Sequence, residues 1–123
     1  MEEYLRRKID KYLLDWKANP GHKPLIIKGA RQVGKTKSIQ QFANKNYESV
    51  VEINFAEEHK FKQIVENGYS PETVIQNISR IRAGVKFIPH KTLIFFDEVQ
   101  EFPDVTTSLK FFAQDGRFDV ICS

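Results

Sequence analysis

The N-terminal part of the chain has an amphipathic pattern. Over residues 2–18, apolar side chains recur at spacings of three and four, so they fall on one face of an α-helix while polar residues fill the other face. Residues 19–24, NPGHKP, contain proline and glycine, which typically end a helix. We therefore predict a helix over residues 2–18, with Trp16 anchoring it to the rest of the domain. The apolar positions are Leu5, Ile9, Tyr12, Leu13 and Trp16.

The rest of the chain alternates between short apolar runs and helical patterns. Apolar runs bounded by turn residues predict strands at 25–28, 49–55, 92–96 and 118–123. Helical spacing predicts helices at 34–46, 57–68, 70–84 and 103–116. Strands that alternate with helices form right-handed crossovers, so the sequence predicts a three-layer α/β/α domain around a mainly parallel sheet. The 92–96 strand, TLIFF, is apolar throughout and is expected near the centre of that sheet.

Composition narrows the class of protein. The 123 residues suffice for one domain, and the net charge of +3 is spread along the chain, which favours a solvated surface over a nucleic-acid stripe. A single cysteine, Cys122, excludes an internal disulfide and fits a reducing compartment. No apolar run approaches the roughly 18 residues that a membrane span needs. The charged N-terminus does not resemble a secretory signal, so we expect a cytoplasmic protein without a transmembrane segment.

The loop after the first predicted strand matches a phosphate-binding motif. Residues 29–36, GARQVGKT, fit the pattern G-x-x-x-x-G-K-[ST] between a buried strand and a helix. Inward-pointing backbone N–H groups bind anions, and the following helix adds the positive end of its dipole. Gly29 and Gly34 permit a close approach that a Cβ would block. The predicted nucleotide-binding residues are Gly29, Ala30, Arg31, Gln32, Val33, Gly34, Lys35, Thr36 and Lys37.

Two side chains of this motif carry distinct chemistry. Lys35 supplies a positive charge to the β- and γ-phosphates, so we count it among the catalytic residues. The Thr36 hydroxyl can coordinate Mg²⁺, which accepts only one or two ligands from protein and keeps several waters. Arg31 and Lys37 flank the phosphate site, where they either add charge to it or face solvent.

An acidic pair follows the TLIFF strand. Asp97 and Glu98 stand at its carboxyl end, where open α/β sheets bind their ligands. Asp97 is predicted to hold the magnesium through a water, as in P-loop NTPases. Glu98 is predicted to polarise a water that attacks the γ-phosphate, a general-base role worth roughly 10²–10⁴ in rate. Gln100 either senses the γ-phosphate from the strand end or lies on the surface.

Together with neighbouring segments, these motifs resemble a known protein family. PLIIKGARQVGKT, VEINF, LIFFDEVQEFP and SLKFF resemble a family of bacterial and archaeal AAA-type ATPases, in which an N-terminal ATPase domain precedes a C-terminal region of uncertain function. The resemblance implies ATP as nucleotide, magnesium as metal and Glu98 as the catalytic glutamate. It also implies that the TLIFF strand lies between the first strand and the 49–55 strand. Family members continue past the fourth strand, so the chain is expected to be an N-terminal fragment, with no arginine finger assignable.

The sequence as a whole predicts a P-loop ATPase domain over residues 1–123, with an N-terminal helix at 2–18 and a nucleotide-binding core at 24–123. Its expected activity is magnesium-dependent ATP hydrolysis coupled to an unknown client, either protein or DNA, with oligomerisation possible in a longer protein. The alternative is a nucleotide-binding switch whose output is conformation, with little turnover. Glu98 favours the ATPase, whereas the missing finger favours the switch for the isolated chain.

Overall fold

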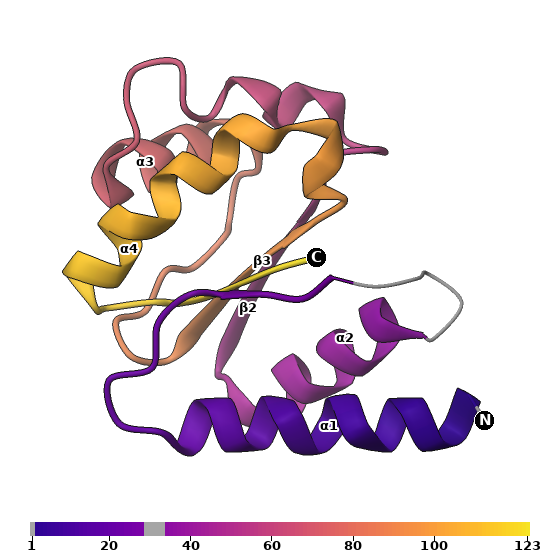
Figure 1. The fold of residues 1–123 in the computed structure, drawn as a ribbon. Helices are drawn as coiled ribbons and strands as arrows, with labels where there is room; N and C mark the ends of the chain where they lie inside the picture. Colours follow the sequence, from indigo (N-terminus) through magenta and orange to yellow (C-terminus); the bar gives the residue numbers. More distant parts are fainter. Residues whose placement is uncertain (1, 29–33) are drawn as a thin grey trace.

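The computed structural model describes residues 2–28 and 34–123. Four α-helices, four strands and three short 3₁₀ helices lie in the described part (Figure 1). The α-helices are α1 (Glu2–Ala18), α2 (Lys35–Asn46), α3 (Pro71–Ile81) and α4 (Leu109–Asp115). The strands are β1 (Leu25–Ile26), β2 (Ser49–Asn54), β3 (Thr92–Asp97) and β4 (Asp119–Cys122), and the 3₁₀ helices are η2 (His59–Gln63), η3 (Val99–Glu101) and η4 (Pro103–Ser108).

The four strands form one parallel sheet in the order β1-β4-β3-β2. The prediction of a mainly parallel sheet is therefore confirmed, and β3 is central as expected. β3 lies between β1 and β2, as the resemblance implied, but β4 is inserted between β1 and β3: Ile26 pairs with Cys122, and Cys122 pairs with Phe96. The last strand along the chain inserts between two earlier ones, which the order of elements in the sequence does not reveal.

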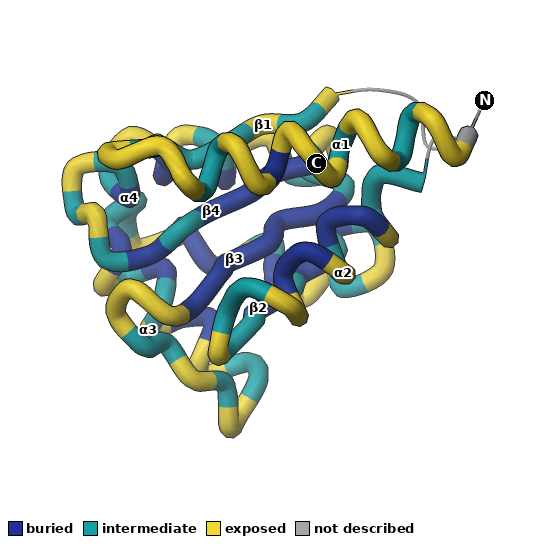
Figure 2. Tube along the Cα trace, turned by 90° about the horizontal axis from the view of Figure 1, so that it is seen from below, coloured by how far each residue is buried: buried dark blue, intermediate teal, exposed yellow. Residues whose placement is uncertain are grey.

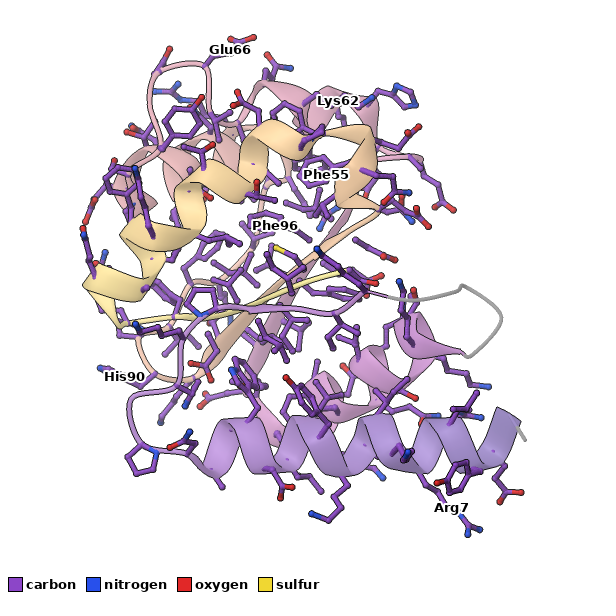
Figure 3. The ribbon with its side chains drawn as sticks, viewed as in Figure 1. Arg7, Phe55, Lys62, Glu66, His90 and Phe96 are labelled. Atoms are coloured by element: carbon purple, nitrogen blue, oxygen red, sulfur yellow. The ribbon has the colours of Figure 1, made fainter. Side chains whose placement is uncertain are left out.

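Helices cover both faces of the sheet, which confirms the three-layer architecture (Figure 1). The side chains of β3 alternate between the layers. Leu93 and Phe95 pack with residues of α1 and α2, whereas Ile94 and Phe96 pack with residues of α3 and α4. Both central strands are almost fully buried, while the outer surface of α1 is exposed (Figure 2). In Figure 3, Phe55 and Phe96 lie between the sheet and the α3–α4 layer, with ring centroids 5.7 Å apart.

The N-terminal helix α1 spans the predicted residues and packs along α2. Leu13 is fully buried against this layer, and Trp16 packs beside Phe42 with ring centroids 6.4 Å apart. The Trp16 indole Nε1 donates to the backbone oxygen of Lys23 at 2.8 Å, which ties the helix to the turn that follows it. Trp16 therefore anchors α1 to the domain, as its place on the apolar stripe predicted.

Two predicted helices differ in the structure. Residues 57–68 form the 3₁₀ helix η2 and turns instead of an α-helix. From Phe61 onward their backbone hydrogen bonds join residues three apart, as from the Ile64 N–H to the Phe61 oxygen at 3.2 Å. Phe61, Ile64 and Val65 are nevertheless buried as predicted, because a 3₁₀ turn also places residues three apart on one side. The 103–116 segment likewise begins as the 3₁₀ helix η4 before α4.

Candidate functional site

The carboxyl ends of the parallel strands meet the N-terminal end of α2 at one edge of the sheet (Figure 1). Of the predicted phosphate-binding residues, Gly29, Ala30, Arg31, Gln32 and Val33 lie outside the described residues. Gly34, Lys35, Thr36 and Lys37 are described and form the junction of the loop with α2. Lys37 is exposed, whereas Gly34, Lys35 and Thr36 are half-buried.

Gly34 explains why the motif needs a glycine at this position. It is the N-cap of α2 and has φ 69° and ψ 27°, the left-handed conformation that side-chain-bearing residues adopt rarely. The chain can therefore turn sharply into the helix. No acidic side chain lies in the first turn of α2, so no carboxylate there opposes the positive end of the helix dipole. The start of α2 is suited to an anion.

Thr36 and Asp97 meet across this junction. The Thr36 hydroxyl donates to Asp97 Oδ2 at 3.3 Å, which is long for a hydrogen bond between oxygens. The second carboxylate oxygen, Oδ1, accepts the backbone N–H of Glu98 at 2.9 Å. Burial raises the pKa of Asp97, and the Glu98 N–H bond opposes that rise only in part. A buried carboxylate beside a threonine hydroxyl is a pair of oxygen ligands of the kind that Mg²⁺ prefers.

Glu98 adopts an uncommon backbone conformation directly after β3. Its φ of 57° and ψ of 47° lie in the left-handed region, which costs a non-glycine residue about 1 kcal/mol or more. The surrounding chain holds this turn, because the Val99 N–H donates to the Ser123 oxygen at 3.1 Å. The Gln100 amide donates to the Glu98 carboxylate Oε2. Glu98 is therefore held in a defined position beside Asp97.

A cavity of about 330 Å³ opens at the same edge of the sheet. Lys28, Lys35 and Gln100 contribute polar side chains to its wall, and the rest of the lining is largely apolar. Two lysines in one wall favour an anionic occupant. The cavity shares Lys35 with the phosphate motif, so the space beside the start of α2 is lined by positive charge.

The match to a family model decides what kind of domain this is. The model for the AAA domain matches residues 21–123. The chain belongs to the AAA domain family. A search of curated proteins and a search of solved structures gave no match. The AAA domain has a P-loop NTPase-like fold and is a nucleotide-binding, ATPase-like domain, which agrees with the glycine motif at the start of α2.

Two negative findings concern the described part of this AAA domain. None of its helices is long and apolar enough to span a membrane. Its described His, Cys, Asp and Glu side chains form no cluster of three that could hold a metal ion by themselves. A magnesium held by Thr36 and Asp97 would therefore take its remaining ligands from phosphate oxygens and waters, as this ion usually does.

The structure also shows a neighbour of the site that the sequence did not indicate. Arg6 of α1 lies over Gly34: a Cβ on Gly34 would stand 3.4 Å from Arg6 Cδ. The amphipathic pattern of α1 places Arg6 next to the apolar stripe but says nothing about which part of the domain that stripe packs against. Only the crossing of α1 over α2 brings this arginine to the phosphate motif.

Proposed function

We propose that this AAA domain binds ATP with magnesium and hydrolyses it, and that hydrolysis is coupled to a client, either protein or DNA. The observation that carries the proposal is the contact between the Thr36 hydroxyl and the buried Asp97 carboxylate, with Glu98 as the next residue. This contact joins the glycine motif at the start of α2 to the acidic pair at the end of β3. It supports the proposal that these two segments are the halves of one nucleotide-hydrolysing site.

The glycine motif would hold the phosphates. Backbone N–H groups of residues 29–34 and the first turn of α2 would donate to phosphate oxygens, with the helix dipole favouring their charge. Lys35 would place its ammonium at the β- and γ-phosphates, and Lys37 would add charge from the surface. Arg31 is proposed to flank the same phosphates.

Thr36 and Asp97 fit a magnesium ion by their chemistry. Both offer oxygen ligands. Because the contact between them is long, the Asp97 carboxylate receives only a weak hydrogen bond from the Thr36 hydroxyl. Magnesium bound here would neutralise charge on the β- and γ-phosphates. Thr36 would hold it directly and Asp97 through a water.

Glu98 would act as the general base. Its carboxylate would accept a proton from the water that attacks the γ-phosphate, a role worth roughly 10²–10⁴ in rate. The Gln100 amide donates to Oε2 and so helps to hold the carboxylate in position. The left-handed backbone at Glu98 is a cost that such a role would explain, since strain of this kind concentrates at active sites.

The test is a comparison of the chain with its Glu98→Gln variant. We expect the variant to keep its affinity for ATP while turnover falls by roughly 10²-fold or more, because the amide cannot accept the proton. Phosphate release and calorimetric binding would be measured on the same preparations. Equal turnover in the two proteins would contradict the role of Glu98.

A second candidate function is a nucleotide-binding switch with little turnover. The observation that favours it is the contact of Gln100 with Glu98, which engages one oxygen of the proposed base. In that case ATP would change the protection of α2 and β3 against hydrogen exchange without measurable phosphate release. Glu98→Gln would then leave the exchange pattern with ATP unchanged.

A further inference from the structure

Arg6 lies against the last residue of the phosphate motif. A Cβ built on Gly34 would stand 3.4 Å from Arg6 Cδ, 3.6 Å from Cγ and 3.7 Å from Nε. The aliphatic stem of the arginine therefore covers Gly34 at van der Waals distance. Because Gly34 directly precedes Lys35 and Thr36, the stem of Arg6 and its Nε lie beside the start of α2, while Nη2 contacts Gln41 further along the helix.

The guanidinium of Arg6 makes few hydrogen bonds to its neighbours. It carries five N–H donors. Its Nε is buried and has no hydrogen-bond partner among the described residues. Its Nη2 donates to Gln41 Oε1, an uncharged acceptor, at 3.3 Å, which is beyond the usual range for such a bond. A buried donor without a partner is costly, so the arrangement needs a reason.

Three other arginines of the described chain have carboxylate partners, and Arg6 differs from them; Arg80 on α3 also lacks one and donates to Asn77 Oδ1 at 3.3 Å. Within residues 2–28 and 34–123, no carboxylate forms an ion pair with Arg6. Its sequence neighbour Arg7 pairs with Glu3 at 3.0 Å and points away from the domain (Figure 3). Arg82 pairs with Glu58, and Arg117 with Asp115 and Glu72. Arg6 thus holds a positive charge beside the phosphate motif that no described carboxylate neutralises.

We propose that Arg6 donates its guanidinium N–H groups to the phosphate chain of the nucleotide bound at the start of α2. The proposal rests on the proposed ATP site and adds a binding residue from outside the glycine motif. Arginine suits this role because its planar fork matches phosphate oxygens and its charge is retained in a protein interior. The N-terminal helix α1 then forms part of the nucleotide site, and bound nucleotide stabilises the packing of α1 on α2.

The experiment measures the dissociation constant of magnesium ATP by calorimetry for the full chain and for Arg6→Met. Methionine keeps an unbranched stem over Gly34 but has no charge. Hydrogen bonds to charged groups contribute about 1.5–3 kcal/mol each, so we expect affinity to fall about tenfold or more. Adenosine, which has no phosphate, serves as the second ligand, and its affinity should not change. Melting temperatures without ligand check that Arg6→Met folds. If it does not, Arg6→Lys replaces it and should still weaken ATP binding, by less than tenfold, because lysine keeps the charge but not the planar fork.

Two matched controls separate phosphate binding from helix packing. Arg7→Met removes the neighbouring positive charge from the solvent side of α1 and should change ATP affinity less than twofold. Gln41→Ala removes the acceptor that holds Arg6 to α2. It should also leave ATP affinity nearly unchanged.

Every outcome decides the proposal. An ATP affinity of Arg6→Met within twofold of the unmodified chain, while Lys35→Ala loses binding, overturns the role of Arg6 and leaves the ATP site standing. A loss in Gln41→Ala as large as in Arg6→Met also overturns it, because helix packing then explains the effect. An unmodified chain that binds no ATP overturns the proposed function, and the Arg6 proposal with it.

Discussion

Two aspartates at opposite ends of the parallel sheet differ in the hydrogen bonds that their carboxylates accept. Asp119 begins β4, and Asp97 ends β3. Asp119 accepts from the Tyr47 hydroxyl, and its Oδ1 lies 2.7 Å from His22 Nε2. Among the described residues, Asp97 has one side-chain donor, the Thr36 hydroxyl at 3.3 Å, and one backbone donor, although only 3% of its surface is exposed.

The surroundings of Asp119 form a closed network. His22 Nδ1 lies 2.9 Å from the Asn19 oxygen, and the His22 ring packs edge-on against Trp16. Burial, and then the bond to Asp119, raise the pKa of Tyr47, so its hydroxyl stays a donor. This network joins the end of α1, the C-cap of α2 and the start of β4. Two side chains from separate segments contact the Asp119 carboxylate, which indicates a structural role.

The difference between Asp119 and Asp97 indicates where a ligand would bind. A partly buried carboxylate with two side-chain partners at short distance, such as Asp119, stabilises the fold. A buried carboxylate whose pKa is raised by burial, and whose one side-chain hydrogen bond is long, is costly to the fold and suited to a cation. On this comparison, the two ends should respond in opposite ways to the same kind of substitution.

The largest effect is expected from Asp119→Ala. Removing the carboxylate leaves Tyr47 and His22 without their shared partner, so we expect the free energy of unfolding to fall by about 2–3 kcal/mol. Affinity for ATP should stay within twofold. Urea denaturation measures the first quantity and calorimetry the second. A stable variant that no longer binds ATP would break the comparison.

The next largest effect is expected from Asp97→Asn, at the carboxyl end of β3. We expect the increase in ATP affinity that magnesium gives to fall by about 10- to 100-fold, as is usual when a group that orients a metal site is changed. Titrations with and without magnesium isolate this effect. If the variant kept the full magnesium dependence, Asp97 would have no part in holding the ion.

Gln100→Ala should have a smaller effect, confined to turnover. Losing the donor to Glu98 removes one hydrogen bond to a charged group, so we expect the rate constant to fall about tenfold while ATP affinity and melting temperature are unchanged. In the Glu98→Gln background, Gln100→Ala should cause no further loss. A lowered melting temperature instead would assign Gln100 to the fold.

The smallest effect is on stability, and its sign distinguishes the two aspartates. The pKa of Asp97 is raised on folding, so above pH 4 the unfolded state releases the proton more readily than the folded state. Stability contributed by this group is therefore present at low pH and lost as pH rises through the folded pKa. Without ligand, Asp97→Asn should thus increase the free energy of unfolding at neutral pH, and the gain should shrink on acidification. Urea denaturation across pH 4–8 measures it, and a decrease at neutral pH would contradict the account.

Much of the fold could be predicted because local patterns and packing agree. The alternation of Leu93 to Phe96 between two covered faces follows from a strand that is apolar throughout. Ser70 caps α3 by accepting the Thr73 N–H at 3.2 Å, and Pro71 opens the helix, both as the sequence indicates. The prediction of an α-helix over residues 57–68 was wrong because the spacing of Phe61, Ile64 and Val65 suits either an α-helix or 3₁₀ turns.

The candidate site could be predicted only where it lies in motifs. The contact of Thr36 with Asp97 follows from a glycine motif before one helix and an acidic pair after a buried strand. The Gln100 contact with Glu98 depends on the left-handed turn at Glu98, and no local sequence pattern predicts that turn. Arg6 reaches Gly34 through the packing of two helices, and β4 enters the sheet between β1 and β3. Both depend on contacts between segments far apart in the chain.

The central claim is that the start of α2 and the end of β3 form a site for magnesium ATP. The most direct test is calorimetric binding of magnesium ATP to the chain and to Lys35→Ala, with Lys45→Ala, an exposed lysine at the far end of α2, as control. The account predicts that Lys35→Ala weakens binding by about a hundredfold, from loss of charge-assisted bonds to phosphate, and that Lys45→Ala does not. Equal binding by Lys35→Ala and the unmodified chain would contradict it.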